Sequence, residues 1–132
     1  MKNIYKTGFL TILTFITILF LSGCENEESL TQSSSSPYSG SWQIVFAGSY
    51  TGSGNFNIDS KGKFAVNVLL YDGSGTFTNT IDGSVSNSGS VNADIYYSGS
   101  KIGTVSGTFL SKSGNGSWST NSTSGTWSAT KN

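Results

Sequence analysis

The sequence predicts an all-β protein: an eight-stranded antiparallel up-and-down meander barrel that follows a signal peptide and a flexible tether. Three observations support this prediction. The only proline is Pro37, and no helical apolar period follows it. Turn signals rich in Gly, Ser and Asn recur roughly every ten residues, as in β-sandwiches and barrels. The links are short, and short links join antiparallel neighbours.

The N-terminal segment is typical of a secretory signal. Lys2 and Lys6 precede the uncharged apolar run FLTILTFITILFL at residues 9–21. This run is too short to span a bilayer, which needs about 20 residues, but it has the length of a signal-peptide apolar region. The residues that follow it, Leu-Ser-Gly-Cys at 21–24, resemble a bacterial lipobox.

The lipobox resemblance implies a lipoprotein. Residues 1–23 would be removed as the signal peptide, and Cys24 would carry acyl chains such as palmitate. The alternative is an ordinary signal peptide with a chance cysteine. With a lipid on Cys24, the protein would be held at the cell envelope, at the outer membrane and with possible exposure on the cell surface.

Residues 24–37 are predicted to form a flexible polar tether, because ENEESLTQSSSSP lacks apolar periodicity. Glu25, Glu27 and Glu28 resemble the acidic surface-export signal of lipoproteins from the Bacteroidota. A simple solvated linker explains them equally well. The remaining residues, 38–132, are long enough for one domain with a modest core.

Eight strands are expected in this domain, from alternating segments between turns. Their predicted bounds are 40–47, 50–59, 63–71, 76–85, 90–97, 101–110, 115–120 and 125–130. The first and last strands should pair antiparallel and close the barrel, with Trp42 and Trp127 inside. Outward positions such as Thr78 and Thr80 are polar, so the outer face fits water rather than lipid.

A glycine two positions before a large residue recurs through the domain, as in GSW at 116–118 and GTW at 125–127. Residues two apart in a strand point to the same face. The repeated pattern therefore predicts a way of filling a narrow barrel, with small residues leaving room for large ones.

The first strand, with Gly40-Ser-Trp42, and the later Gly62-Lys-Phe64 resemble the first strands of the calycin group, which includes the lipocalins and avidins. The resemblance covers one short motif and the strand count. It implies a small barrel that could carry a ligand inside. The further lipocalin motifs and an avidin-type biotin pocket have no counterpart in this sequence.

An even strand number brings the chain back to its starting end, so the tether enters at one end and the opposite end faces away. Aromatic residues are expected to fill the tether end, with Trp118 and Trp127 at mid-height or below. Tyrosines collect at the far strand tips, where they either recognise a partner or cover the open rim. The candidate binding residues at the far rim are Tyr50, Tyr71, Asp72, Tyr96, Tyr97 and Lys101.

The sequence lacks the residues that several classes of function need. The chain has no His, and its single Cys is Cys24. The aspartates of the domain are dispersed, so we expect no catalytic pair, no metal site and no cofactor. Clustered Lys and Arg for nucleic-acid binding are also missing.

The sequence therefore favours a non-catalytic binding module, anchored to the membrane through its N-terminal lipid, that uses the far rim. Its partner would be a protein, a glycan or another envelope component. One alternative is a lipocalin-like carrier of a small ligand, although the aromatic filling argues against an internal cavity of 300 Å³ or more. The other is a passive structural surface lipoprotein.

Replacing the acylation site tests the anchor. Cys24→Ala should abolish lipid attachment, because no other thiol is available to be acylated. Metabolic labelling with a fatty acid and membrane sedimentation measure the effect. A variant that still labels and sediments with membranes would show that the lipobox interpretation is wrong.

Overall fold

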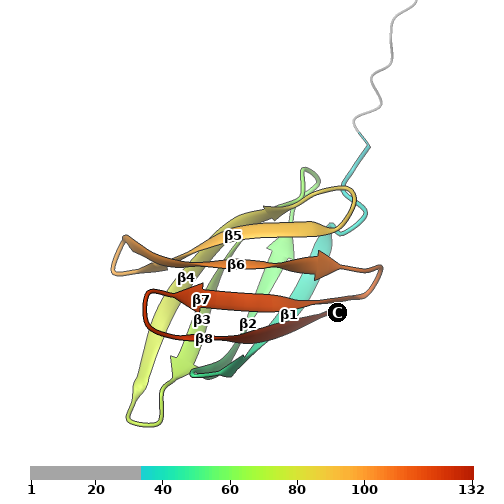
Figure 1. Ribbon diagram of the computed structural model, residues 1–132. Coiled ribbons are helices and arrows are strands. Elements are labelled where there is room, and N and C mark those ends of the chain that lie inside the picture. Colours follow the sequence, from blue (N-terminus) through green and yellow to red (C-terminus); the bar gives the residue numbers. More distant parts are fainter. Residues whose placement is uncertain (1–33) are drawn as a thin grey trace, which may run out of the picture. The chain divides into compact units, whose positions relative to one another are not determined.

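The computed structural model describes residues 34–132. The predicted signal peptide, Cys24 and the acidic residues after it lie outside the described residues. Residues 34–132 form a closed barrel in which every strand pairs antiparallel with its sequence neighbours (Figure 1). This confirms the predicted fold class and is consistent with a calycin-like barrel. No helix long and apolar enough to cross a membrane occurs in this part of the chain.

The eight strands agree with the predicted ones to within two residues at each end. Their bounds are β1 Gly40–Gly48, β2 Thr51–Ile58, β3 Lys63–Tyr71, β4 Thr76–Val85, β5 Ser90–Tyr97, β6 Ser100–Phe109, β7 Ser113–Thr120 and β8 Ser124–Lys131. As predicted, β1 and β8 pair antiparallel and close the barrel, with Phe46 opposite Trp127. Trp42 and Trp127 are both buried inside.

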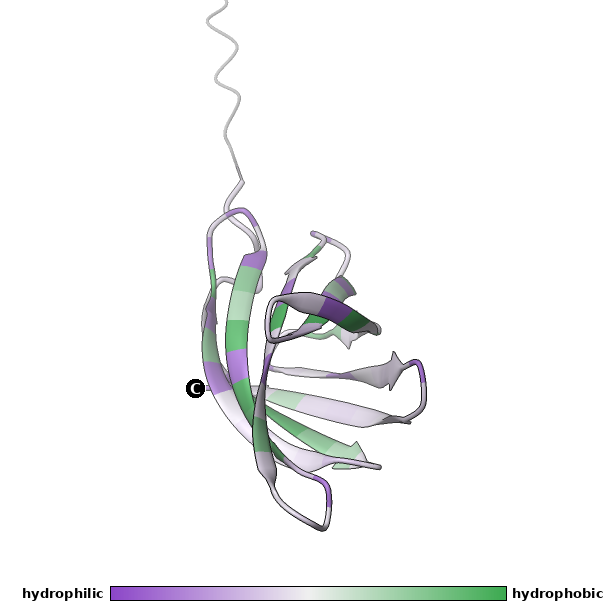
Figure 2. Ribbon diagram, turned by 90° about the vertical axis from the view of Figure 1, so that its left-hand side faces the viewer, coloured by the Kyte–Doolittle hydropathy of each residue, from purple (hydrophilic) through white to green (hydrophobic). Residues whose placement is uncertain are grey.

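Inward and outward side chains alternate with the period of two that a strand imposes. On β3, Val66, Val68 and Leu70 are buried, whereas Asn67 and Leu69 between them are exposed. Figure 2 shows the same pattern as green, hydrophobic bands that alternate with pale or purple ones along the strands. The apolar side chains therefore form one core inside the barrel.

The hairpin β7–β8 places the two Gly-Ser/Thr-Trp motifs against each other. Gly116 lies opposite Trp127, and Trp118 lies opposite Gly125. A Cβ atom at Gly116 would lie 2.8 Å from the indole nitrogen of Trp127, and one at Gly125 would lie 2.7 Å from the ring of Trp118. The glycines do line the inside, but each one makes room for the tryptophan of the partner strand rather than for its own.

Each of these indoles crosses the glycine of the adjacent strand and reaches a carbonyl on the strand beyond. The Trp127 indole N–H donates to the Ser106 carbonyl on β6 at 2.9 Å. The Trp118 indole N–H donates to the Ala47 carbonyl on β1 at 3.2 Å. The hydrogen bonds satisfy buried polar groups, and each one spans three adjacent strands. The bond of Trp118 crosses the pairing of β8 with β1 that closes the barrel.

The end of the barrel at which β1 begins is filled. The Phe109 ring packs edge-on against Trp42 with centroids 4.5 Å apart, and against Tyr38 at 6.0 Å. Trp42 donates its indole N–H to the Tyr38 carbonyl at 2.8 Å, and the Ser36 backbone N–H bonds to Ser60. Ser36 and Tyr38 thus belong to the plug that closes this end.

The contact between glycine and tryptophan should be sensitive to any added side chain. Gly116→Val should lower the free energy of unfolding by about 1–3 kcal/mol, because the new side chain meets Trp127 and the β6 backbone. Ser117→Val, at the adjacent exposed position, should change it by less than about 0.5 kcal/mol. Urea unfolding followed by tryptophan fluorescence compares the two. Equal losses would contradict the cross-strand packing.

Candidate functional site

The end of the barrel opposite the plug is open. In Figure 1 the link between β3 and β4 lies at this end, far from the cyan segment at residue 34. A cup of about 560 Å³ occupies the opening. Its lining comes from the strand ends and links at this end: Tyr50, Asp72, Gly75, Thr76, Phe77, Asn79, Tyr97, Ile102, Thr120, Asn121 and Ser122. This volume lies within the range of about 300–1,000 Å³ usual for ligand sites.

Aromatic rings form one wall of the cup. Tyr50 meets Phe77 edge-on, with centroids 5.0 Å apart and planes at 82°. Phe77 in turn meets Tyr97 at 6.2 Å and 88°. Trp118 lies beneath this wall, and the Tyr50 ring stacks on it with centroids 5.4 Å apart and planes at 11°. Because Trp118 is buried and held by its hydrogen bond to β1, it provides a rigid support for Tyr50.

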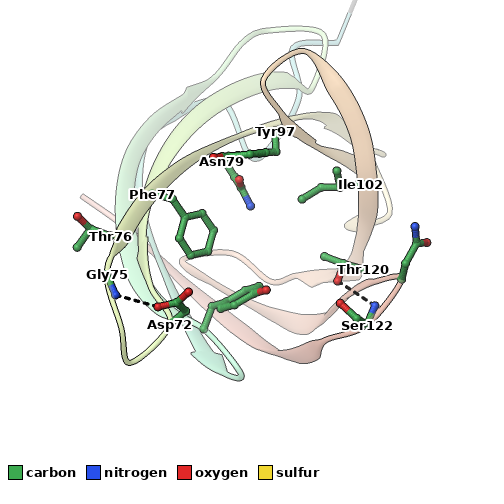
Figure 3. A pocket seen from close by; sticks show the side chains of 11 residues that line it. Asp72, Gly75, Thr76, Phe77, Asn79, Tyr97, Ile102, Thr120 and Ser122 are labelled. Carbon is green, nitrogen blue, oxygen red and sulfur yellow. Dashed lines mark hydrogen bonds between the residues drawn. The ribbon is translucent and has the colours of Figure 1, made fainter.

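Asn79 lies on the inner face of β4 at the base of the cup. It is 1% exposed, and its Oδ1 has no hydrogen-bond partner among the described residues. Figure 3 shows its side chain within the opening, between Phe77 and Tyr97. A buried amide oxygen without a partner costs free energy, so this position is a candidate for contact with a bound molecule.

Asp72 belongs to the rim, and its carboxylate closes the turn between β3 and β4. Its Oδ1 accepts hydrogen bonds from the Ser74 hydroxyl at 2.7 Å and from the backbone N–H groups of Ser74 and Gly75. These bonds, the one from the Ser74 hydroxyl foremost, hold the pKa of Asp72 below its ordinary value. The carboxylate is therefore ionised at neutral and mildly acidic pH.

The six predicted rim residues all lie at this end, but they separate into two groups. Tyr50, Asp72 and Tyr97 line the cup. The other three are on the outer wall: Tyr71, Tyr96 and Lys101. Tyr71 is 49% exposed and donates its hydroxyl proton to the Gly73 carbonyl.

Lys101 forms an ion pair with Asp94 on the outer wall, with 2.7 Å between Nζ and Oδ1. The hydrogen bond to Asp94 raises the pKa of Lys101. Asp94 lies opposite Asp82 in the β4–β5 ladder, beside a depression of about 420 Å³. Within residues 34–132, no group of three or more acidic, His or Cys side chains could hold a metal ion.

Sequence reasoning missed Phe77, Asn79 and the support from Trp118 as parts of the site. Trp118 was expected at mid-height or lower. Trp118 lies higher, because its strand ends at the open end and its ring contacts Tyr50 and Phe46 there. Asn79 had a detectable signal: it is the polar inward residue between Phe77 and Ile81 on β4.

Comparison with known proteins adds no functional assignment. No protein-family model matches the chain, and no curated protein matches it. The function must therefore be argued from the geometry of the cup.

The two tyrosines next to the opening should differ in their effect on stability. Tyr50→Ala should lower the free energy of unfolding by about 1–3 kcal/mol, because it removes contacts with both Phe77 and Trp118. Tyr71→Ala removes an exposed side chain, and its effect should stay within about 0.5 kcal/mol. Thermal unfolding followed by near-UV circular dichroism measures both. A larger loss for Tyr71→Ala would refute the placement.

Proposed function

We propose that this protein is a non-catalytic binding protein of the cell envelope, held to the membrane by lipid on Cys24, whose ligand site is the cup. The observation that supports the proposal most directly is the open volume of about 560 Å³ lined by Tyr50, Phe77 and Tyr97, with the buried Asn79 amide at its base. Concave sites with aromatic walls and a few polar groups are the usual form of ligand pockets.

The cup is a better source of binding energy than the outer rim. Binding energy concentrates in aromatic anchors that become fully desolvated, and a concave site desolvates them more completely than a convex wall. Tyr71 lies on the convex side and its hydroxyl already has a partner in its own turn. Lys101 is likewise engaged by Asp94. The proposal therefore assigns binding to Tyr50, Asp72 and Tyr97 among the predicted residues.

The proposal combines two of the alternatives that the sequence leaves open. A ligand would enter the mouth of the barrel, as in a carrier, but only as far as Asn79. Below it lie Ile81, Ile95 and Trp118, which are buried and packed. A small molecule, or the end group of a larger envelope component, fits this depth. A long ligand threaded through the barrel does not.

The position of the cup also suits an anchored protein. The Leu-Ser-Gly-Cys motif at 21–24 supports lipid attachment, and the described chain begins at the plugged end, opposite the cup. With the lipid attached through the N-terminal segment, the opening would be the part of the barrel most accessible to molecules away from the membrane. We propose the outer membrane as the location of the protein.

Two matched tyrosines test the proposal. Tyr97 in the cup and Tyr71 on the outer wall are each 49% exposed, so replacing either with Ala should alter stability little. We expect an extract of the producing cells to raise the melting temperature of the full chain, and native mass spectrometry to detect the bound molecule. Tyr97→Ala should weaken binding roughly tenfold or more, and Tyr71→Ala should leave it unchanged.

Two results would contradict the proposal. Equal weakening by both substitutions would assign binding to the whole rim rather than to the cup. Failure of every extract fraction to bind the unmodified chain would favour a passive structural role.

A further inference from the structure

Asn79 interrupts an otherwise apolar inner face near the mouth of the barrel. Its inward neighbours on β4 are Phe77 and Ile81, and Ile81 is also fully buried. An apolar side chain at this position would avoid the cost of burying an unpaired amide. The free Oδ1 is a hydrogen-bond acceptor, so the partner that it lacks is a donor.

That donor cannot readily come from below. The space beneath Asn79 is a void of about 10 Å³, at the lower limit for one water molecule, and its walls are mostly apolar, including Phe46, Leu70 and Ile95. A buried water needs at least about 10–15 Å³ and two to four polar partners. The other polar side chains there are Tyr50, whose ring is stacked on Trp118, and Thr120, which is hydrogen-bonded to Thr123 across its own turn at 2.8 Å. The donor is therefore expected from the cup above.

The walls of the cup suit a ring with an apolar face and a polar edge. Tyr50, Phe77 and Tyr97 offer aromatic surface for the apolar face to cover. Across the opening, Ser122 contributes a hydroxyl at the rim near Thr120 (Figure 3), and Asn121 also lines the cup. A sugar ring has both an apolar face and a polar edge, because its C–H groups form apolar patches and its hydroxyl groups project from the edge.

The charges around the cup narrow the class of ligand further. Among the described residues that line the cup there is no lysine or arginine, and Asp72 is the one carboxylate. An anionic ligand would meet a negative charge without a compensating cation. A cation would have to lose its water against a neutral amide and apolar side chains, which is costly. A neutral ligand incurs neither penalty.

We propose that the cup binds a neutral sugar residue, which covers the aromatic wall with its C–H face and donates a hydroxyl hydrogen bond to Asn79 Oδ1. This rests on the proposed function, since it assumes that the cup is the ligand site. Asn79 is the specificity-determining residue. An apolar ligand of the same size would leave Oδ1 of Asn79 without a hydrogen-bond partner.

Nuclear magnetic resonance of the full chain labelled with ¹⁵N tests the proposal. The titrants are glucose, galactose, mannose and N-acetylglucosamine, with glucuronate as the matched anionic sugar and tetramethylammonium and laurate as non-sugar probes. We expect at least one neutral sugar to shift the side-chain amide signals of Asn79 and the indole N–H signal of Trp118. The second signal reports on the cup because Trp118 lies directly under Tyr50.

Asn79→Leu should weaken binding of that sugar roughly tenfold or more while keeping or raising the melting temperature, since it removes an unpaired buried amide. A purely structural role for Asn79 would lower the melting temperature instead. Asn67→Leu is the matched control, because Asn67 is an exposed asparagine on the outer face of the adjacent strand. It should leave sugar binding unchanged.

The proposal is overturned if no neutral sugar shifts the Asn79 signals, or if Asn79→Leu binds the sugar as well as the unmodified chain does. Shifts of the cup signals by tetramethylammonium, laurate or glucuronate alone would overturn the sugar assignment and leave the cup as a binding site. Absence of shifts with all seven probes, together with no ligand from cell extract, would overturn both proposals.

Discussion

The narrow interior of an eight-stranded barrel is the constraint on which the rest of this structure depends. Such a barrel has room for little more than its own side chains, and this one contains three tryptophans. Two of them fit because the β7–β8 register sets a glycine opposite each ring. The space that Gly116 and Gly125 leave is used by Trp127 and Trp118, whose indole N–H groups then bond to β6 and β1. Closure and filling are thus achieved by the same contacts.

The uneven distribution of large side chains along the barrel produces the cup. Tyr38, Trp42 and Phe109 pack together at the end where the described chain begins. At the other end the inward positions carry smaller or polar residues, such as Ile102, Thr120 and Asn79. Trp118 ends the packed region, and Tyr50 lies on it as the first ring of the open wall. The site is therefore a continuation of the core, with aromatic rings that are supported from below rather than free at the surface.

The candidate site could be predicted only in outline from the sequence. The tyrosines and Asp72 were located at the correct end, because an even number of strands with short links determines which strand tips meet. Tyr96 and Tyr97 are adjacent, yet Tyr97 lines the cup and Tyr96 does not. The period of two along β5 separates them, because Tyr97 shares the inner face with the buried Ile95 and Tyr96 has the opposite parity. The alternation along β4 marks Asn79 as a polar inward residue, but only the surrounding side chains show that its oxygen lacks a partner.

The sequence by itself determined the number of strands, their bounds to within two residues, and the alternation of inward and outward side chains along them. These properties are local, since a period of two along the chain and a glycine-rich turn need no distant partner. Only the tertiary structure decided which residues meet across strands: Gly116 with Trp127, Tyr50 with Trp118, and Asn79 with an opening above an apolar floor. The stagger of the strands around the closed barrel determines these contacts, and this stagger depends on the packing of the whole core.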